Sequence, residues 1–224
     1  MIGAILPDAV AVAEAFADED GAELFAEELR VVGEAVEKRR REFATGRACA
    51  RRALAQLGLP AGPIPSGERG EPRWPGGVVG SITHCDGYRA CGVARGDDLA
   101  TIGVDAEPHR PLPEGLLDTI ARPEERVWLA KLSRGHPEVH WDRLLFSAKE
   151  SVYKAWFPLA GRWLGFEQAT LTVDPEGRRF KARLLVPGPL VEGAELTGFD
   201  GRWLVDDGLV VTAIALAAGA SAGP

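Results

Sequence analysis

Hydrophobic residues recur at every third or fourth position between about Glu138 and Phe157. This period predicts a helix with one apolar side, which needs a partner surface to be buried. The apolar positions are Trp141, Leu144, Leu145, Ala148, Val152, Ala155 and Trp156. The opposite side carries a polar stripe made of Arg143, Ser147, Glu150 and Lys154, with Lys149 to one side of it. The helix therefore presents one carboxylate surrounded by cations.

The remaining patterns predict helices followed by strands, twice along the chain. In the first half, helices are expected at 8–17, at 22–29 and from near Val32 to Leu57, where Gly58 and Pro60 end the last one. Short strands follow near 78–84, 92–94 and 102–106. The second half has helices near 116–121 and 123–132, the long helix, and strands near 168–174, 178–186, 196–205 and 208–216.

Two carboxylates lie on one face of the strand predicted at 102–106. Asp105 and Glu107 are two positions apart, so they point the same way, while Ile102 and Val104 point into the core. Like charges on one face repel each other unless a cation lies between them. Mg²⁺ takes about six oxygen ligands and keeps some waters and substrate phosphates among them. Together with Glu150, these residues predict a magnesium site that acts on a phosphate ester.

Each feature also has an ordinary structural interpretation. An Asp-x-Glu sequence alone is usually a solvated strand edge, and Glu150 with Lys154 would usually be an exposed helix pair worth only ~0.2–0.5 kcal/mol. Lysine usage favours the functional interpretation. Of 26 basic residues only five are lysines, and two of these, Lys149 and Lys154, lie within six residues of each other.

Composition sets the frame for these motifs. A net charge of −7 argues against a nucleic-acid binder, and 46% hydrophobic residues suffice for a core. Cys49, Cys85 and Cys91 lack metal-site spacing and are expected as reduced thiols. Without a basic leader or an apolar run of ~18 residues, no signal peptide and no membrane contact are expected. We therefore expect a cytoplasmic protein.

A basic helix and a glycine-rich loop stand out in this acidic chain. The predicted helix ending at Leu57 carries Lys38, Arg39, Arg40, Arg41, Arg47, Arg51 and Arg52. A solvated helix face is the ordinary interpretation for any one of them, but a cluster of guanidinium groups suits phosphate oxygens. The following segment, 62–77, is rich in glycine and proline and predicts an ordered loop whose amides can approach a phosphate.

The two motifs together resemble one enzyme family. Gly103-Val-Asp-Ala-Glu107, followed by Phe146-Ser-Ala-Lys-Glu-Ser-Val-Tyr-Lys-Ala155, resembles the paired motifs of the Sfp-type 4′-phosphopantetheinyl transferases, and in particular the shorter actinobacterial members. The resemblance implies an α/β (α+β) fold with a pseudo-twofold pair of subdomains, each an antiparallel sheet packed on a long helix. The expected bounds are 1–103 for the N-terminal subdomain, 104–216 for the C-terminal subdomain and 217–224 for a flexible tail.

The same resemblance implies roles for individual residues. Asp105, Glu107 and Glu150 would hold Mg²⁺, Glu150 would take the proton from the attacking serine, and Lys149, Lys154 and His84 would offset charge on the leaving group. The expected coenzyme A contacts are Arg39, Arg47, Ser66, Gly67, Glu68, Arg69, Thr83, His84, Asp105 and Lys149. The run Arg39–Arg41 leaves one of these contacts ambiguous by one residue, and Ser66 lacks the charge that many relatives have there.

The implied reaction transfers 4′-phosphopantetheine from coenzyme A to a serine of an apo acyl carrier or peptidyl carrier protein and releases 3′,5′-ADP. Two alternatives remain at this point. Another Mg²⁺-dependent phosphotransferase would use the same carboxylates with nucleoside triphosphates. A non-catalytic docking protein would keep the fold but lose Glu150 or Lys154, and both residues are present.

Overall fold

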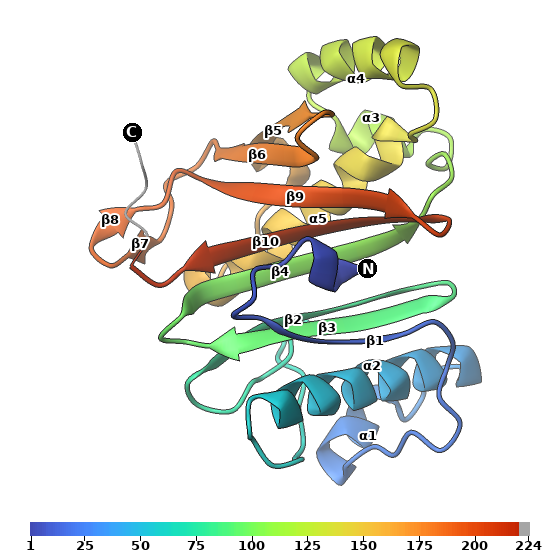
Figure 1. Ribbon diagram of the computed structural model, residues 1–224, viewed down its shortest axis with the longest axis vertical. Helices are drawn as coiled ribbons and strands as arrows, with labels where there is room; N and C mark the ends of the chain where they lie inside the picture. Colours follow the sequence, from blue (N-terminus) through green and yellow to red (C-terminus); the bar gives the residue numbers. More distant parts are fainter. Residues whose placement is uncertain (220–224) are drawn as a thin grey trace.

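Two antiparallel sheets lie side by side, each covered by one long helix, in the computed structural model, which describes residues 1–219 (Figure 1). The first sheet has the order β1-β3-β2 and is built from β1 (Ala11–Ala15), β2 (Val78–Cys85) and β3 (Tyr88–Arg95). Helix α2 (Glu37–Gln56) packs on it, and α1 (Ala26–Val32) lies beside α2. A short 3₁₀ turn, η1 (Ile2–Ala4), precedes β1.

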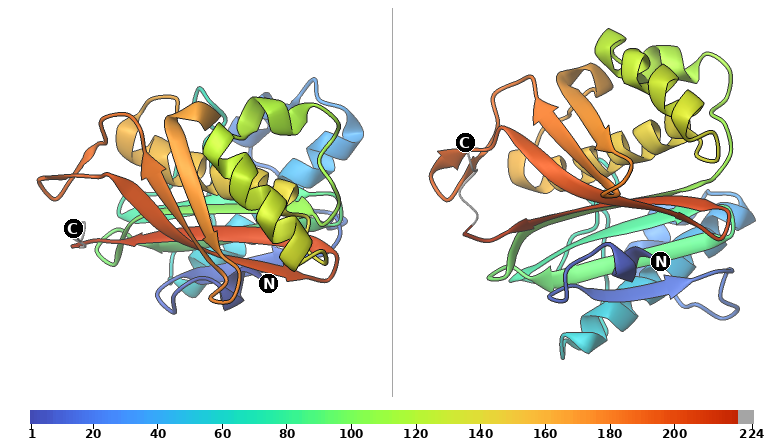
Figure 2. Two further views of the ribbon diagram at one scale, coloured as in Figure 1. Left: turned by 90° about the horizontal axis from the view of Figure 1, so that it is seen from above. Right: turned by 45° about the horizontal axis from the view of Figure 1, so that its top comes forward.

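The second sheet has five strands in the order β4-β10-β9-β6-β5. Its strands are β4 (Leu99–Pro108), β5 (Ala169–Asp174), β6 (Arg179–Leu184), β9 (Gly198–Asp206) and β10 (Leu209–Ala217). Helix α5 (Trp141–Ala160) covers one face, with α4 (Pro123–Gly135) and α3 (Leu116–Ile120) beyond it (Figure 2). The smaller elements are η2 (Phe166–Gln168) and the hairpin of β7 (Leu190–Val191) and β8 (Ala194–Glu195).

Side-chain hydroxyls join the two sheets where β2 runs beside β4. The Val104 N–H donates to Ser81 Oγ at 3.1 Å, and the Ala106 N–H donates to Thr83 Oγ1 at 2.9 Å. The sequence offset is the same for both bonds, so the two strands run parallel. Thr83, which the resemblance implies as a coenzyme A contact, thus also connects the two sheets through a hydrogen bond.

Each face of β4 packs against a different half of the molecule. Ile102, Val104 and Ala106 are fully buried with residues of the N-terminal segment, as the alternation predicts. The other face lies against α5, whose apolar stripe forms the largest core cluster with β5, β6, β9 and β10. Burial of this stripe confirms the predicted helix, which begins at Trp141 and ends at Ala160.

The fold class is confirmed as mixed α/β with antiparallel sheets and packed helices. The helix predicted at 8–17 is wrong: residues 11–15 form β1 and pair with β3. Alternation decides this segment, because Ala13 and Ala15 face the α2 core while Glu14 binds the Met1 ammonium on the other side. The helix predicted from Val32 begins instead at Glu37, since α1 ends at Val32.

The predicted boundary between residues 103 and 104 falls inside β4, which pairs with β10 from Leu99 onward. The subdomain division stays a prediction. The predicted flexible tail, 217–224, begins with the last residue of β10, and its residues 220–224 lie outside the described part of the chain. Within residues 1–219, no helix is long and apolar enough to span a membrane.

Candidate active site

Lys154 and Asp105 connect the two predicted motifs. Lys154 Nζ on α5 donates to Asp105 Oδ1 on β4 at 2.7 Å and to the Val104 carbonyl at 3.1 Å. Asp105 is 5% exposed, and its second oxygen, Oδ2, is buried without a hydrogen-bond partner among residues 1–219. A buried carboxylate oxygen without a donor is costly unless a cation or water satisfies it. This oxygen is therefore the first indication of a cation site.

The absence of a side chain at Gly103 allows this contact. A Cβ at position 103 would lie 2.0 Å from the Ser151 carbonyl oxygen and 2.7 Å from the Ala155 nitrogen, both backbone atoms of α5. Thr101, on the same face, donates from Oγ1 to the Ala155 carbonyl at 2.9 Å. The strand and the helix can thus approach closely enough for Lys154 to reach Asp105.

Glu107 and Glu150 have pKa values that suit a cation site. Burial, and next the charge of Asp105, raises the pKa of Glu107 to about 6, although Arg143 lowers it through a 2.8 Å ion pair. Burial, followed by Asp105, also raises the pKa of Glu150, and Lys154 opposes this shift. Both carboxylates thus carry unfavourable charge that a nearby cation would relieve.

The three carboxylates are neighbours but do not form a closed ligand cluster. In residues 1–219, no group of three or more His, Cys, Asp or Glu side chains has an arrangement that could hold a metal ion as it stands. Glu107 is held by Arg143, which also donates to the Arg110 and Pro111 carbonyls at 3.1 and 2.9 Å. Carboxylate and water oxygens are nevertheless the donors that Mg²⁺ prefers, and Oδ2 of Asp105 lacks another partner.

Lys149 is not brought to the carboxylates. Its Nζ lies 2.8 Å from Glu125 Oε2 on α4 and donates to the Phe166 and Ala169 carbonyls at 2.8 and 3.2 Å. The side chain is 2% exposed, and burial lowers the pKa of Lys149 although Glu125 raises it. The geometry gives Lys149 a bracing role between α5, α4 and η2. Glu125, fully buried, was missed by sequence reasoning because nothing along the chain pairs it with Lys149.

A cavity of about 680 Å³ lies between the two halves. Its lining comes from the glycine-rich loop at 68–74, from β2 at 80–82 and from the side of α5 that carries Glu150, Tyr153 and Lys154. Trp163 also lines the cavity, is 61% exposed and packs against Tyr153 with tilted rings whose centroids are 4.7 Å apart. Glu68 and Arg69 thus face the same cavity as Glu150 and Lys154, as predicted for a site shared by both halves.

Arg39 and His84 form a second group of predicted residues, on α2 and β2. Arg39 Nη1 lies 2.5 Å from His84 Nε2. Burial, with the charges of Arg39, Lys154 and Arg89, lowers the pKa of His84 to about 4. The imidazole is therefore neutral at pH 7, and its Nε2 accepts a hydrogen bond from the Arg39 guanidinium. The Arg39 side chain is 44% exposed, so the pair has room to accept an anion.

Arg47 is buried and contacts Ser66, so it does not lie on an open surface. Arg47 is 4% exposed, donates from Nε to the Ile64 carbonyl at 2.8 Å and from Nη2 to Ser66 Oγ at 3.0 Å. Burial lowers the pKa of Arg47 to about 10, which leaves it charged at pH 7. These bonds fasten the glycine-rich loop to α2.

Glu71 shapes the turn of the same loop, and sequence reasoning assigned it no role. The Gly67 N–H donates to the Glu71 carbonyl at 2.7 Å, and the Arg69 N–H donates to its carboxylate at 3.0 Å. A Cβ at Gly67 would meet that carboxylate, so a larger residue there would displace the Glu71 side chain from the turn. The Gly-x-x-Gly-Glu spacing of this loop is the signal that could have identified it.

Comparison with known proteins agrees with this geometry. Two family models match: the 4′-phosphopantetheinyl transferase N-terminal domain over residues 27–94 and the 4′-phosphopantetheinyl transferase superfamily over residues 101–195. The 4′-phosphopantetheinyl transferase Svp of Streptomyces mobaraensis is 57% identical over 97% of this chain and 90% of its own length. The transferase Npt of Nocardia iowensis is 50% identical over 97% and 100%, and PptT of Mycobacterium tuberculosis is 48% identical over 96% and 98%.

The chain belongs to the 4′-phosphopantetheinyl transferase superfamily. The resemblance inferred from the two motifs is confirmed, including its focus on the short actinobacterial members. The protein is an enzyme that transfers 4′-phosphopantetheine from coenzyme A to carrier proteins.

Proposed function

We propose that coenzyme A binds in the cavity between the glycine-rich loop and α5, and that Glu150 and Lys154 act on its pyrophosphate there. The observation that carries this proposal is the shared lining: Arg69 of the loop and Glu150 and Lys154 of the helix face one space of about 680 Å³. A space of ~300–1,000 Å³ is typical for a bound small molecule. Cations on two of its walls suit a ligand with several phosphates.

Mg²⁺ fits the carboxylates next to this cavity. Asp105, Glu107 and Glu150 would hold it, because Asp105 Oδ2 has no other partner and the pKa values of the other two are raised. When bound, Mg²⁺ would neutralise charge on the pyrophosphate of coenzyme A.

Proton transfer, charge stabilisation and hydrogen bonding to the phosphates are then assigned to side chains of this chain. Glu150, whose pKa is raised by burial, takes the proton from the attacking serine hydroxyl. Lys154 lies beside Asp105 and offsets the charge that builds on the leaving 3′,5′-ADP. His84 is neutral and, with Nε2 accepting from Arg39, can donate from Nδ1 to a phosphate oxygen. Lys149 holds α5 against α4 and does not touch the reacting atoms.

Arg39, beside His84, is the best placed arginine for the 3′-phosphate of coenzyme A. It is the more exposed of the two arginines predicted to bind coenzyme A, whereas Arg47 is buried and holds the loop. We therefore assign the 3′-phosphate contact to Arg39 within the ambiguous run 39–41, and a supporting role to Arg47. Ser66 and Gly67 act through the shape of the loop, and Glu68 lines the cavity.

The carrier protein would dock near the mouth of the cavity, at the Pro108–Leu117 loop and the exposed Trp163, which lies against the half-buried Tyr153. Because the enzyme carries a net charge of −7, attraction by net charge cannot account for binding to an acidic carrier. An apolar centre would carry the affinity, and rim charges would affect the association rate. The affinity for one apo acyl or peptidyl carrier protein should therefore change little between low and high salt, and a collapse of binding would contradict this docking mode.

One experiment tests the proposed function. The enzyme is incubated with coenzyme A, Mg²⁺ and a panel of apo acyl and peptidyl carrier proteins, and each carrier is weighed by mass spectrometry for the added phosphopantetheine. Glu150→Gln, which keeps the side-chain volume, should add none. A parallel incubation with nucleoside triphosphates tests the alternative phosphotransferase. Transfer that persists without any divalent cation would contradict the magnesium site.

We expect the reaction to take place in the cytoplasm, without contact with membranes or nucleic acid.

A further inference from the structure

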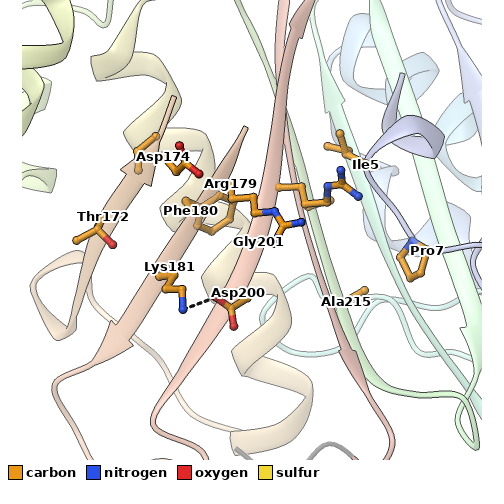
Figure 3. A pocket seen from close by; sticks show the side chains of 13 residues that line it. Ile5, Pro7, Thr172, Asp174, Arg179, Phe180, Lys181, Asp200, Gly201 and Ala215 are labelled. Carbon is orange, nitrogen blue, oxygen red and sulfur yellow. Dashed lines mark ion pairs between the residues drawn. The ribbon is translucent and has the colours of Figure 1, made fainter. Parts of the chain in front are cut away.

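A second cavity, of about 700 Å³, lies on the face of the five-stranded sheet that points away from α5. Alternation along β6 places its cations on this face, while Phe180, Ala182 and Leu184 face the core. Figure 3 shows Arg179 reaching from β6 across Gly201 of β9. This cavity shares none of its lining residues with the cavity proposed for coenzyme A.

Two arginines are directly opposite each other in this cavity. Arg179 on β6 pairs in register with Arg202 on β9, and both are exposed. Like charges directly opposite each other across strands destabilise a sheet. Two carboxylates also line the cavity: Asp200 pairs with Lys181 at 3.6 Å, and Asp174, the register partner of Arg179 on β5, accepts the Gly177 N–H at 3.0 Å. Within residues 1–219, neither Arg179 nor Arg202 forms an ion pair.

The side of the cavity next to β10 and the N-terminal segment is apolar. Arg202 pairs in register with Ala213 of β10, and Ala213 and Ala215 form the floor beside the two guanidinium groups. Ile5 and Pro7, from the segment between η1 and β1, form one wall. Two guanidinium forks above an apolar floor match a group that is anionic at one end and apolar at the other.

We infer that this face binds a small organic phosphate, whose phosphate is clamped by Arg179 and Arg202 and whose apolar part lies on Ala213 and Ala215. The clamp would also remove the repulsion between the two arginines, so the ligand should stabilise the folded protein. The inference does not depend on the magnesium site or on the position of coenzyme A, because the two cavities are separate.

Phenyl phosphate is a suitable probe, since it combines a phosphate with an apolar ring. Backbone amide NMR at constant ionic strength should show saturable shifts at Gly201, Ala213 and Ala215, with tighter binding than for inorganic phosphate. Arg179→Gln combined with Arg202→Gln should weaken this binding roughly tenfold or more. Arg183→Gln is the matched control, because Arg183 is exposed on the same face of β6 but does not line the cavity; its effect should be under about twofold.

Three results would overturn the inference. Shifts that follow chloride and phosphate alike, without saturation, would show only ionic screening. An equal loss in Arg183→Gln would mean that the charge of the whole face matters, not the clamp. If phenyl phosphate bound no more tightly than inorganic phosphate, the apolar floor would contribute nothing to the affinity. Thermal unfolding with and without the probe checks that each variant is folded and that the ligand stabilises only the proteins that bind it.

Discussion

Lys154 and Asp105 lie 49 positions apart in the chain, yet the Lys154 Nζ and Asp105 Oδ1 atoms are 2.7 Å apart. The lysine occupies one carboxylate oxygen and leaves Oδ2 buried without a partner among the described residues. One side chain thus links both sequence motifs, and the remaining oxygen can accept a further contact. The first prediction addresses that oxygen.

Asp105→Asn keeps the shape of the side chain and removes its charge. We expect transfer to fall about 10²–10³-fold, as when a preorganised electrostatic contact is lost, and binding of Mn²⁺ as a Mg²⁺ substitute to weaken in parallel. The unfolding temperature should change little, because Lys154 can turn to solvent. Asp118→Asn, at the exposed pair with Arg126, is the control and should leave both quantities unchanged. Normal transfer by Asp105→Asn at limiting Mg²⁺ would refute the metal assignment.

The raised pKa of Glu107, about 6 against an ordinary 4.5, predicts a pH-dependent demand for Mg²⁺. A proton on Glu107 competes with the cation, so the Mg²⁺ concentration for half-maximal transfer should rise roughly fourfold between pH 7.5 and 5.5. Without metal, the stabilisation from the raised pKa is full below 4.5 and is lost as pH rises through about 6. Denaturant unfolding of the wild type against Glu107→Gln across this range measures that loss. Identical pH profiles for the two proteins would contradict it.

Gly103→Ala should disturb the approach of β4 to α5, because the new methyl would lie 2.0 Å from the Ser151 carbonyl oxygen. We expect a loss of about 1–3 kcal/mol in the free energy of unfolding, and reduced transfer as Asp105 moves away from Lys154. Gly135→Ala, where a Cβ meets nothing within 4 Å, is the matched control and should not destabilise. Equal unfolding midpoints for the two variants would show that α5 can shift to accommodate the methyl group without a loss of stability.

Arg39 and Arg47 should differ in how they affect coenzyme A binding. Arg39→Ala should reduce the preference for coenzyme A over 3′-dephospho-coenzyme A about tenfold or more, because a charge-assisted contact contributes roughly 1.5–3 kcal/mol. Arg47→Ala should weaken both ligands alike and lower the unfolding temperature, since it releases Ile64 and Ser66 of the loop. Calorimetric titration with both ligands measures the ratio. Loss of the preference in Arg47→Ala alone would reverse the two roles.

Lys149→Met should unfold more easily, because it leaves Glu125 buried without its partner charge, at a cost of about 3–5 kcal/mol. The double variant Lys149→Met with Glu125→Gln should recover part of that loss. The KM for coenzyme A should stay within about twofold where the protein is folded. A catalytic lysine would behave differently: kcat would fall, stability would hold, and Glu125→Gln would have no compensating effect.

Local pattern was sufficient for most of the helices and strands. The period of the apolar stripe in α5 and the alternation in β4 depend only on neighbouring positions, and both were predicted with their correct faces. The helix predicted at 8–17 failed because alanine favours a helix locally, whereas pairing with β3 decides the segment. A strand at a sheet edge depends on a partner more than 70 positions away, which local pattern does not contain.

The sequence by itself determined the residue types and spacings from which the chemistry follows: Asp105, Glu107 and Glu150 as carboxylates, and Lys149 and Lys154 as two ammonium groups five positions apart on one helix. Only the tertiary structure decided which ammonium faces the carboxylates. Lys149 and Lys154 lie on different sides of α5. Lys154 reaches Asp105 because Gly103 lets β4 approach α5 closely, while Lys149 is buried against Glu125. Charge pairing over long distances in sequence depends on how strands and helices pack, and no local pattern records that packing.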